Sequence, residues 1–187
     1  MPNPRLATRY AKSLIDLAIE KDQLEQIFTD MQWLQEVCRL SRDFVNLLKS
    51  PIVKPSKKQQ IVAEILKNNV SDVTALFARL LVSKGRESNL PEIITDFIAQ
   101  YKKYKNIYTI KLTTAYSISE DLKNAIIDQI RKTSDMQNIE LETSVKESLI
   151  GGFVLEAGDK LIDASIAYDL KQISRQFENN EFVYKIR

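Results

Sequence analysis

Hydrophobic residues in the first 105 positions recur at steps of three and four, the spacing that places side chains on one face of an α-helix. Six stretches of this kind follow one another, with short polar segments between them. The first apolar stripe consists of Leu6, Tyr10, Leu14, Leu17 and Ala18. Because short connections place consecutive helices beside each other, the pattern predicts an N-terminal six-helix bundle.

Capping residues indicate where these helices begin and end. Ser56 is a candidate N-cap for the fourth helix, and Ser71 or Asp72 for the fifth, since a side-chain oxygen there accepts a hydrogen bond from a free backbone N–H. Gly85 stands where a left-handed C-terminal cap belongs, and Pro91 opens the sixth helix.

The period of the pattern changes from 3.6 to 2 in the second half of the chain. Residues 108–114 and 139–145 alternate apolar and polar side chains, which predicts two half-buried strands. The Gly158-Asp159 pair lies between two apolar runs and predicts a hairpin with a two-residue type II′ turn.

Two further helices are expected behind Ser119 and Ser165, which are placed as N-caps. We therefore predict a mainly α fold with two domains. Residues 1–105 form the six-helix bundle, and residues 106–187 form a small α/β domain with a short sheet, a hairpin and flanking helices.

The composition narrows the chemistry that such a fold carries. The chain of 187 residues has no histidine, one cysteine and four glycines. Without histidine, the usual Ser-His-Asp and Cys-His nucleophiles and imidazole metal sites are excluded. Cys38 alone cannot build a disulfide or a thiolate zinc site, and the glycine spacing fits neither a P-loop nor a dinucleotide-binding turn. We expect no cofactor, no metal and no catalytic residue.

Charge is distributed unevenly along the chain, although the net charge is only +2. Residues 1–105 contain 17 Lys and Arg against 12 Asp and Glu, whereas residues 106–187 contain 10 against 13. This asymmetry indicates two modules with different partners, but it is too mild for a dedicated nucleic-acid surface. No apolar run approaches the ~20 residues of a membrane helix, so we expect no direct membrane insertion.

The first fifteen residues are basic and contain no acid, which leaves two interpretations. They have the composition of a transit peptide, or they begin an amphipathic helix that happens to be basic. The apolar stripe favours the helix. One unpaired cysteine and no secretion signal indicate a reducing compartment.

Several reactive or acidic residues can be interpreted either as functional or as purely structural. Cys38 lies on an apolar stripe, where a small core residue is expected. The pairs Glu140 and Glu142, and Asp159 and Asp163, have no electrophile, ligand set or oxyanion donor beside them. We interpret both pairs as solvated carboxylates.

Three of the four glycines lie within eight residues, in the string SLIGGFVLEAGDKLIDAS at positions 148–165. This string resembles the C-terminal signature of the delta subunit family of F-type ATP synthase, which includes the mitochondrial oligomycin-sensitivity-conferring protein. The signature residues are Gly151, Gly152, Phe153, Gly158, Asp159, Asp163 and Ser165. Segments further upstream resemble the family in the same order; they are residues 9–14, 83–86, 90–93 and 113–115.

Ala164 and Asn106 depart from the family pattern, which usually has glycine at both positions. We expect the backbone at Ala164 to keep a negative φ, and Asn106 to stiffen the junction between the domains. Neither change touches a chemical requirement, because the role that the resemblance implies is not catalytic.

The resemblance implies a stator subunit in the peripheral stalk of the proton-translocating ATP synthase. Residues 1–105 would bind N-terminal helical segments of the alpha subunits, and residues 106–187 would hold the C-terminal helices of the membrane-anchored b subunits. The subunit would keep the catalytic head from rotating, at the cytoplasmic face of a bacterial plasma membrane or at an organellar membrane. We do not expect an obligate homo-oligomer.

In the family, the alpha-binding groove lies between the first and fifth helices. By helical spacing, the residues expected there are Tyr10, Ser13, Leu14, Leu17, Phe77, Leu80 and Leu81. Apolar anchors at such spacing provide the affinity in helix-in-groove recognition. We expect the hairpin Phe153–Ile162 and the last helix to form the platform for b.

Two other classes of binding protein remain open on the residues alone. An unrelated adaptor for helical peptides would share the composition and the bundle, but it would not be expected to carry the Gly-Gly hairpin string. A nucleic-acid-binding module would use the basic stretches 54–58 and 102–105, which are more typical of cations at helix ends, and its affinity would fall steeply with salt.

Overall fold

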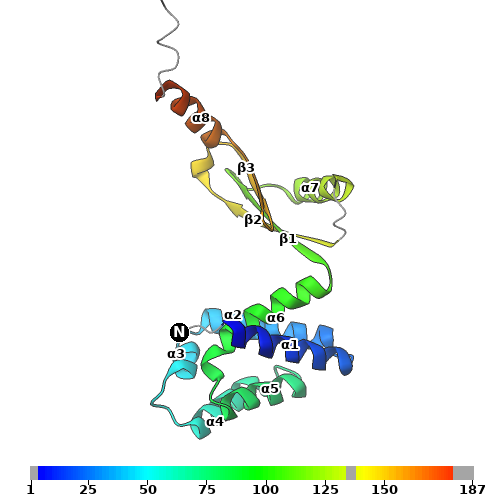
Figure 1. Ribbon diagram of the computed structural model, residues 1–187, viewed down its shortest axis with the longest axis vertical. Coiled ribbons are helices and arrows are strands. Elements are labelled where there is room, and N and C mark those ends of the chain that lie inside the picture. The colour runs from blue at the N-terminus through cyan, green and yellow to red at the C-terminus, as the bar shows by residue number, and fades with distance from the viewer. Residues whose placement is uncertain (1–3, 134–137, 179–187) are drawn as a thin grey trace, which may run out of the picture. The chain divides into compact units, whose positions relative to one another are not determined.

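The computed structural model describes residues 4–133 and 138–178 (Figure 1). The chain divides into a helical unit, residues 1–104, and a sheet unit, residues 105–187. The described residues are mainly helical and contain one four-stranded sheet.

Six α-helices and one 3₁₀ helix make up the described part of the helical unit. They are α1 (Pro4–Glu20), α2 (Leu24–Leu40), α3 (Arg42–Lys49), α4 (Pro55–Leu66), α5 (Asp72–Ser83), η1 (Glu87–Asn89) and α6 (Leu90–Tyr104). At the start of α5, the backbone N–H of Thr74 donates to Ser71 Oγ, as predicted. The prediction that Ser56 caps α4 is wrong, because Pro55 occupies the first turn and Lys54 is the N-cap.

The core of the helical unit is built around α1 and α6, which pack against each other (Figure 1). On α1, Ala7, Ala11 and Ala18 are at most 2% exposed, and their small side chains allow a second helix to approach closely. On α6, Ile93 and Phe97 are fully buried. Burial of side chains of this size contributes roughly 1.5–3 kcal/mol each, so this helix pair anchors the unit.

The sheet unit contains four strands and two α-helices among its described residues. The strands are β1 (Ile107–Thr114), β2 (Asn138–Val145), β3 (Gly152–Ala157) and β4 (Lys160–Ser165), in the order β2-β1-β3-β4. The helices are α7 (Glu120–Thr133) and α8 (Ile166–Glu178), and the 3₁₀ helix η2 (Glu147–Leu149) precedes β3. β1 is parallel to β2, and α7 provides the crossover that a parallel pair requires. β3 is antiparallel to both β1 and β4.

β1 lies inside the sheet and carries its best-buried side chains. Ile110 and Leu112 are each 1% exposed, whereas Lys111 between them is exposed, which is the predicted alternation. Asn106 precedes this strand and adopts φ +51, a left-handed conformation that asparagine tolerates better than most residues. Asn106 thus takes a conformation that a glycine would also adopt there. Ala164 keeps a negative φ, as expected.

Candidate docking surfaces

One flank of α1 carries a stripe that the core of the helical unit leaves partly open. Leu6, Tyr10, Ser13 and Leu17 follow one another at steps of four, three and four, so they lie along one line of the helix. Leu17 is 36% exposed and Ser13 is exposed, whereas Leu6 and Tyr10 are half-buried. This line borders the buried alanine face.

α5 presents a second stripe of apolar residues. Val73, Leu76, Phe77 and Leu80 lie at helical spacing, and Leu76 and Leu80 are 62% and 45% exposed. The ring of Phe77 meets the ring of Tyr10 edge to face, with 6.4 Å between the centroids and 66° between the planes. The contact joins the two stripes. We call their eight residues the α1/α5 surface: Leu6, Tyr10, Ser13, Leu17, Val73, Leu76, Phe77 and Leu80.

Leu14 and Leu81 do not belong to this surface, although the spacing predicted them there. Each is 1% exposed and lies in the core, while Phe77 is 8% exposed. Position 14 lies on the same side of α1 as Ala7, Ala11 and Ala18, and therefore offers no area to a partner. Leu6, Val73 and Leu76 are the apolar members that the prediction omitted. Each lies one turn before a predicted residue, which is Tyr10, Phe77 or Leu80, and this spacing was the available signal.

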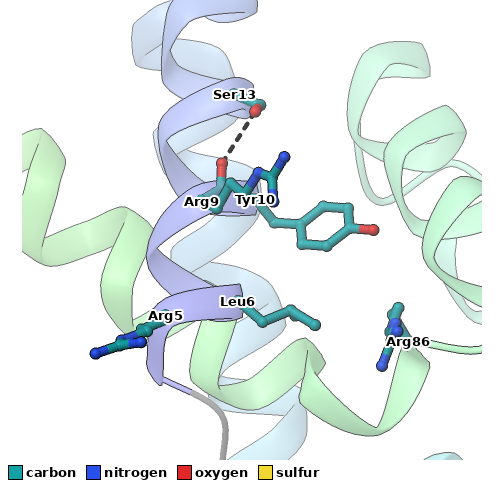
Figure 2. A pocket seen from close by; sticks show the side chains of 6 residues that line it. All are labelled: Arg5, Leu6, Arg9, Tyr10, Ser13 and Arg86. Atoms are coloured by element: carbon teal, nitrogen blue, oxygen red, sulfur yellow. Dashed lines mark hydrogen bonds between the residues drawn. The ribbon is translucent and has the colours of Figure 1, made fainter.

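A cleft opens at the N-terminal half of α1 (Figure 2). It encloses about 640 Å³ and is lined by Arg5, Leu6, Arg9, Tyr10, Ser13 and Arg86. Figure 2 shows Leu6 and Tyr10 projecting from α1 toward the side on which Arg86 lies. Ser13 Oγ donates to the backbone carbonyl of Arg9 at 2.9 Å, so this hydroxyl is held along the helix. The cleft combines an apolar wall with cations.

The backbone that carries Arg86 is fixed by the end of α5. Gly85 adopts φ +63, Arg86 N donates to Leu81 O at 2.8 Å, and Gly85 N donates to Val82 O at 3.1 Å. These two bonds form the Schellman motif that ends many helices. The C-terminal cap predicted at Gly85 is therefore confirmed.

Glu87, the residue after Arg86, is fixed by a buried ion pair that sequence reasoning missed. Lys58 Nζ lies 2.7 Å from Glu87 Oε1 and donates to Leu48 O at 2.9 Å. The two side chains are only 5% and 11% exposed. This pair ties η1 to α4, and it removes Lys58 from the basic stretch 54–58 that could contact a phosphate.

A buried carboxylate on α2 fixes the opposite end of α5. Asp30 Oδ2 accepts hydrogen bonds from Ser71 N at 2.9 Å, Ser71 Oγ at 2.6 Å and Thr74 Oγ1 at 2.7 Å. A negative charge at this position also interacts favourably with the positive N-terminal end of the α5 dipole. With both ends of α5 held, the α1/α5 surface lies on rigid elements.

In the sheet unit, the glycine-rich signature forms the entry to β3 and its hairpin. Gly152 adopts φ +73, and a Cβ built there would lie 2.1 Å from the carbonyl oxygen of Ala164. At the other end of the strand, Ala157 pairs with Lys160, which leaves Gly158-Asp159 as a two-residue turn. Gly158 has φ +59 and Asp159 a negative φ, consistent with the predicted type II′ turn.

The remaining signature polar residues begin α8. Asp163 Oδ1 accepts from Ser165 N at 3.0 Å and from Ser165 Oγ at 2.6 Å. Ser165 Oγ in turn accepts from Tyr168 N at 3.2 Å and so caps the helix, as predicted. Asp163 and Ser165 therefore have a structural role in the link between β4 and α8.

The sheet unit leaves apolar side chains uncovered at its β4 edge. Leu112, Leu155 and Ile162 face each other across β1, β3 and β4. The exposed fraction is 1% at Leu112 and 56% at Ile162, with Leu155 half-buried between them. The β4/α8 surface, as we name it, comprises Phe153, Ile162, Ile166, Leu170, Ile173 and Phe177, which are 41–78% exposed.

The chain's thiol and its best-buried phenol are both poorly suited to nucleophilic chemistry. Burial and the nearby charge of Glu92 raise the pKa of Cys38 to about 11, so the thiol stays protonated at neutral pH. Burial and a hydrogen bond to Glu25 raise the pKa of Tyr101 to about 12. Among the described residues, no helix combines the length and the apolar character needed to cross a bilayer. The exposed apolar side chains of the α1/α5 and β4/α8 surfaces are the remaining candidates for a functional site.

The fold resembles that of a solved ATP synthase component. A chain in the structure of the Toxoplasma gondii mitochondrial ATP synthase hexamer superimposes with a TM-score of 0.70. The match covers 92% of this chain and 97% of that chain, at 22% sequence identity.

Sequence comparison assigns the family. The profile of the family described as "ATP synthase delta (OSCP) subunit" matches residues 6–177. ATP synthase subunit delta of Christiangramia forsetii is 31% identical over the whole of both chains, and that of Cytophaga hutchinsonii is 34% identical over 98% of this chain and 100% of its own. The chloroplastic subunit delta of Porphyra purpurea is 30% identical over 93% of this chain and 94% of its own.

The chain belongs to the ATP synthase delta (OSCP) subunit family. It is a component of the peripheral stalk of ATP synthase and is not itself catalytic.

Proposed function

We propose that this chain connects the catalytic head of ATP synthase to the b subunits and so resists the torque of rotation. The helical unit binds an N-terminal helical segment of an alpha subunit, and the sheet unit holds the C-terminal helices of b. The observation that carries the proposal is the presence of an exposed apolar surface on each unit.

The α1/α5 surface supports the first of these contacts. Its exposed apolar members, Leu17, Leu76 and Leu80, flank the half-buried Tyr10 and the well-buried Phe77. From Leu6 to Leu17 the α1 stripe extends for eleven residues, about 16 Å at 1.5 Å per residue. An amphipathic helix of three turns covers this length with anchors at positions i, i+4, i+7 and i+11.

The β4/α8 surface supports the second contact. Ile166, Leu170, Ile173 and Phe177 lie at steps of four, three and four along α8, and each is 46–78% exposed. A monomeric protein rarely leaves such a stripe open to water. A helix of b laid beside α8 would bury it through knobs-into-holes packing.

A peptide titration tests the helical unit. The probe is a synthetic peptide of the N-terminal residues of the same organism's alpha subunit, titrated into the full chain by calorimetry. We expect Leu80→Asp to weaken binding by about tenfold or more, because a charge in the centre of an apolar contact loses hot-spot energy. Leu40→Asp is the matched control, since Leu40 is 79% exposed on α2 and outside the surface. No binding to the wild-type chain would overturn the assignment.

Co-purification tests the sheet unit. A tagged wild-type chain should retain b from solubilised membranes, and a Leu170→Asp, Ile173→Asp double variant should lose b while it keeps alpha. Leu122→Asp is the control, because Leu122 is 48% exposed on α7 and lies outside the β4/α8 surface. Retention of b by the double variant would contradict the assignment.

The same proposal implies where the chain works. Its attachment to the membrane runs through b, at the cytoplasmic face of a bacterial plasma membrane or the corresponding face of an organellar membrane. Extraction of b from the membrane should therefore release this chain with it.

A further inference from the structure

We propose that the cleft at the N-terminal half of α1 recognises carboxylates on the docked helix, through Arg9 and Arg86. This inference rests on the proposed function, in which the helical unit binds a helix of an alpha subunit. It adds the chemistry of the partner: an amphipathic helix with acidic side chains at one end of its apolar stripe.

The cations lie at one end of the α1/α5 surface. Arg9 precedes Tyr10 on α1, and Arg86 follows α5, yet both line the cleft together with Leu6. Figure 2 shows Arg5 extending to the other side of α1, away from Arg86. Arg9 and Arg86 are therefore the two guanidinium groups that a helix lying on Leu6 and Tyr10 would meet.

The positive charge of this end is not neutralised within the described chain. Among residues 4–133 and 138–178, the guanidinium groups of Arg9 and Arg86 make no hydrogen bond or ion pair, and no acidic residue lines the cleft. The acid next in sequence, Glu87, is buried against Lys58. A cleft that is lined by charges of one sign and has low-dielectric walls concentrates the electric field, and a positive cleft therefore attracts an anion.

Arg86 is also held ready for a partner. The Schellman bonds at Gly85 and the Lys58–Glu87 pair fix the backbone on both sides of it. Little backbone ordering therefore opposes binding, which leaves more of the interaction energy for affinity. An arginine can donate two parallel N–H bonds to one carboxylate, and this bidentate pair is stronger than a single hydrogen bond between neutral groups.

The opposite end of the surface has a different character. A second cleft there is lined by Lys21, Gln23, Gln26, Val70, Ser71, Asp72 and Val73. The end of α1 thus lies beside the start of α5, so the two helices run in opposite directions along the surface. One end of the surface is basic and the other carries both signs of charge. Because the basic end attracts carboxylates more strongly than the end with both signs of charge, the docked helix has one preferred orientation.

Charge-removal variants test the proposal with the peptide used above as the probe. The full chain is titrated as wild type and as the Arg9→Gln, Arg86→Gln double variant. We expect the variant to bind about tenfold more weakly, with a shallower dependence on salt. The matched control is Arg42→Gln, Arg79→Gln, which removes the same charge from exposed positions on α3 and α5 outside the cleft. Circular dichroism confirms that each variant is folded.

A second probe separates a failure of this inference from a failure of the proposed function. The same peptide with its Asp and Glu residues changed to Asn and Gln should bind the wild-type chain and the Arg9, Arg86 variant equally. If wild type binds the acidic peptide and both double variants bind it as tightly, the charge recognition is wrong and the docking function stands. If wild type binds neither peptide, the docking function itself is wrong. Tight binding of inorganic phosphate that the Arg9, Arg86 variant loses, with peptide affinity unchanged, would assign the cleft to a free anion instead.

Discussion

The α-carbon of Gly152 lies so close to the backbone of Ala164 that a Cβ at position 152 would come within 2.1 Å of the Ala164 carbonyl oxygen. Gly152 also has φ +73, a conformation that side chains disfavour. We expect Gly152→Ala to destabilise the protein by about 3 kcal/mol or more, because strain and a backbone clash add. Urea unfolding checks this value.

Gly158→Ala is the matched control for this variant. Gly158 has φ +59, but no atom lies within 4 Å of a Cβ built there. The Gly158→Ala variant should therefore lose only about 1–2 kcal/mol of unfolding free energy, the cost of a side chain at positive φ. If both variants lose the same free energy of unfolding, the contact with Ala164 does not contribute to the cost of a side chain at position 152.

Ile150 stores strain in front of the same strand. It has φ +66, which is unfavourable for a β-branched side chain, and it is 54% exposed. We expect Ile150→Gly to raise the free energy of unfolding by about 0.5–1 kcal/mol, since relief of strain exceeds the entropy gained by the unfolded chain. Asn68→Gly, at φ 64, should gain less because asparagine tolerates this conformation. A loss of stability in Ile150→Gly would contradict this account.

Asp30 links α2 to the start of α5 through three hydrogen bonds. Asp30→Ala leaves the Ser71 and Thr74 donors without their acceptor in a buried place. The expected loss is about 3 kcal/mol, the combined cost of a charged hydrogen bond and unsatisfied donors. Asp16→Ala, at an exposed position of α1, should change stability by less than about 0.5 kcal/mol in the same denaturation experiment.

The Lys58–Glu87 pair should show strong coupling in a double-mutant cycle. Lys58→Met leaves a buried carboxylate without its partner, and the expected loss is about 3–5 kcal/mol. Lys58→Met combined with Glu87→Leu should be less damaging than the single change, because no isolated charge remains. Additive losses would rule out this coupling.

Tyr101 contributes to stability through its protonated phenol, and this contribution is lost at alkaline pH. Burial, with a 2.5 Å hydrogen bond from Tyr101 Oη to Glu25, raises the pKa of the phenol from 10.0 to about 12. Because the folded state favours the protonated phenol, this contribution is complete below about pH 10, the unfolded value, and is lost as pH rises through about 12. Tyr101→Phe should therefore lose less stability than wild type over this interval.

Chemical denaturation at a series of alkaline pH values measures this difference. Tyr116→Phe is the control, since Tyr116 is 73% exposed. Its stability should follow the wild-type curve. Ionisation of the tyrosines of the wild-type protein can be followed by absorbance. If all of them ionise together near pH 10, the raised pKa of Tyr101 is refuted.

Local signals in the sequence predicted much of the fold. The two-residue turn at Gly158-Asp159 and the caps at Ser71 and Ser165 depend on residues within three or four positions of each other. Ser56 failed as a cap because Pro55 immediately before it is a better first helical residue, a competition that was also local. Such features can be predicted because the atoms that interact are close along the chain.

Contacts between distant segments could not be predicted in this way. Asp30 meets Ser71 across 41 positions and Lys58 meets Glu87 across 29. In the sequence, each of these residues is indistinguishable from the charged residues of a solvated helix face. No local rule identifies the partner of a buried charge.

The sequence by itself determined where helices, strands and turns form, because periodicity and capping act over a few residues. Only the tertiary structure decided which apolar positions remain at the surface. Leu14 and Leu17 are the same residue three positions apart, yet they are 1% and 36% exposed. The difference arises because neighbouring elements pack over the side of α1 that holds Leu14, and where those elements lie is set by the whole core.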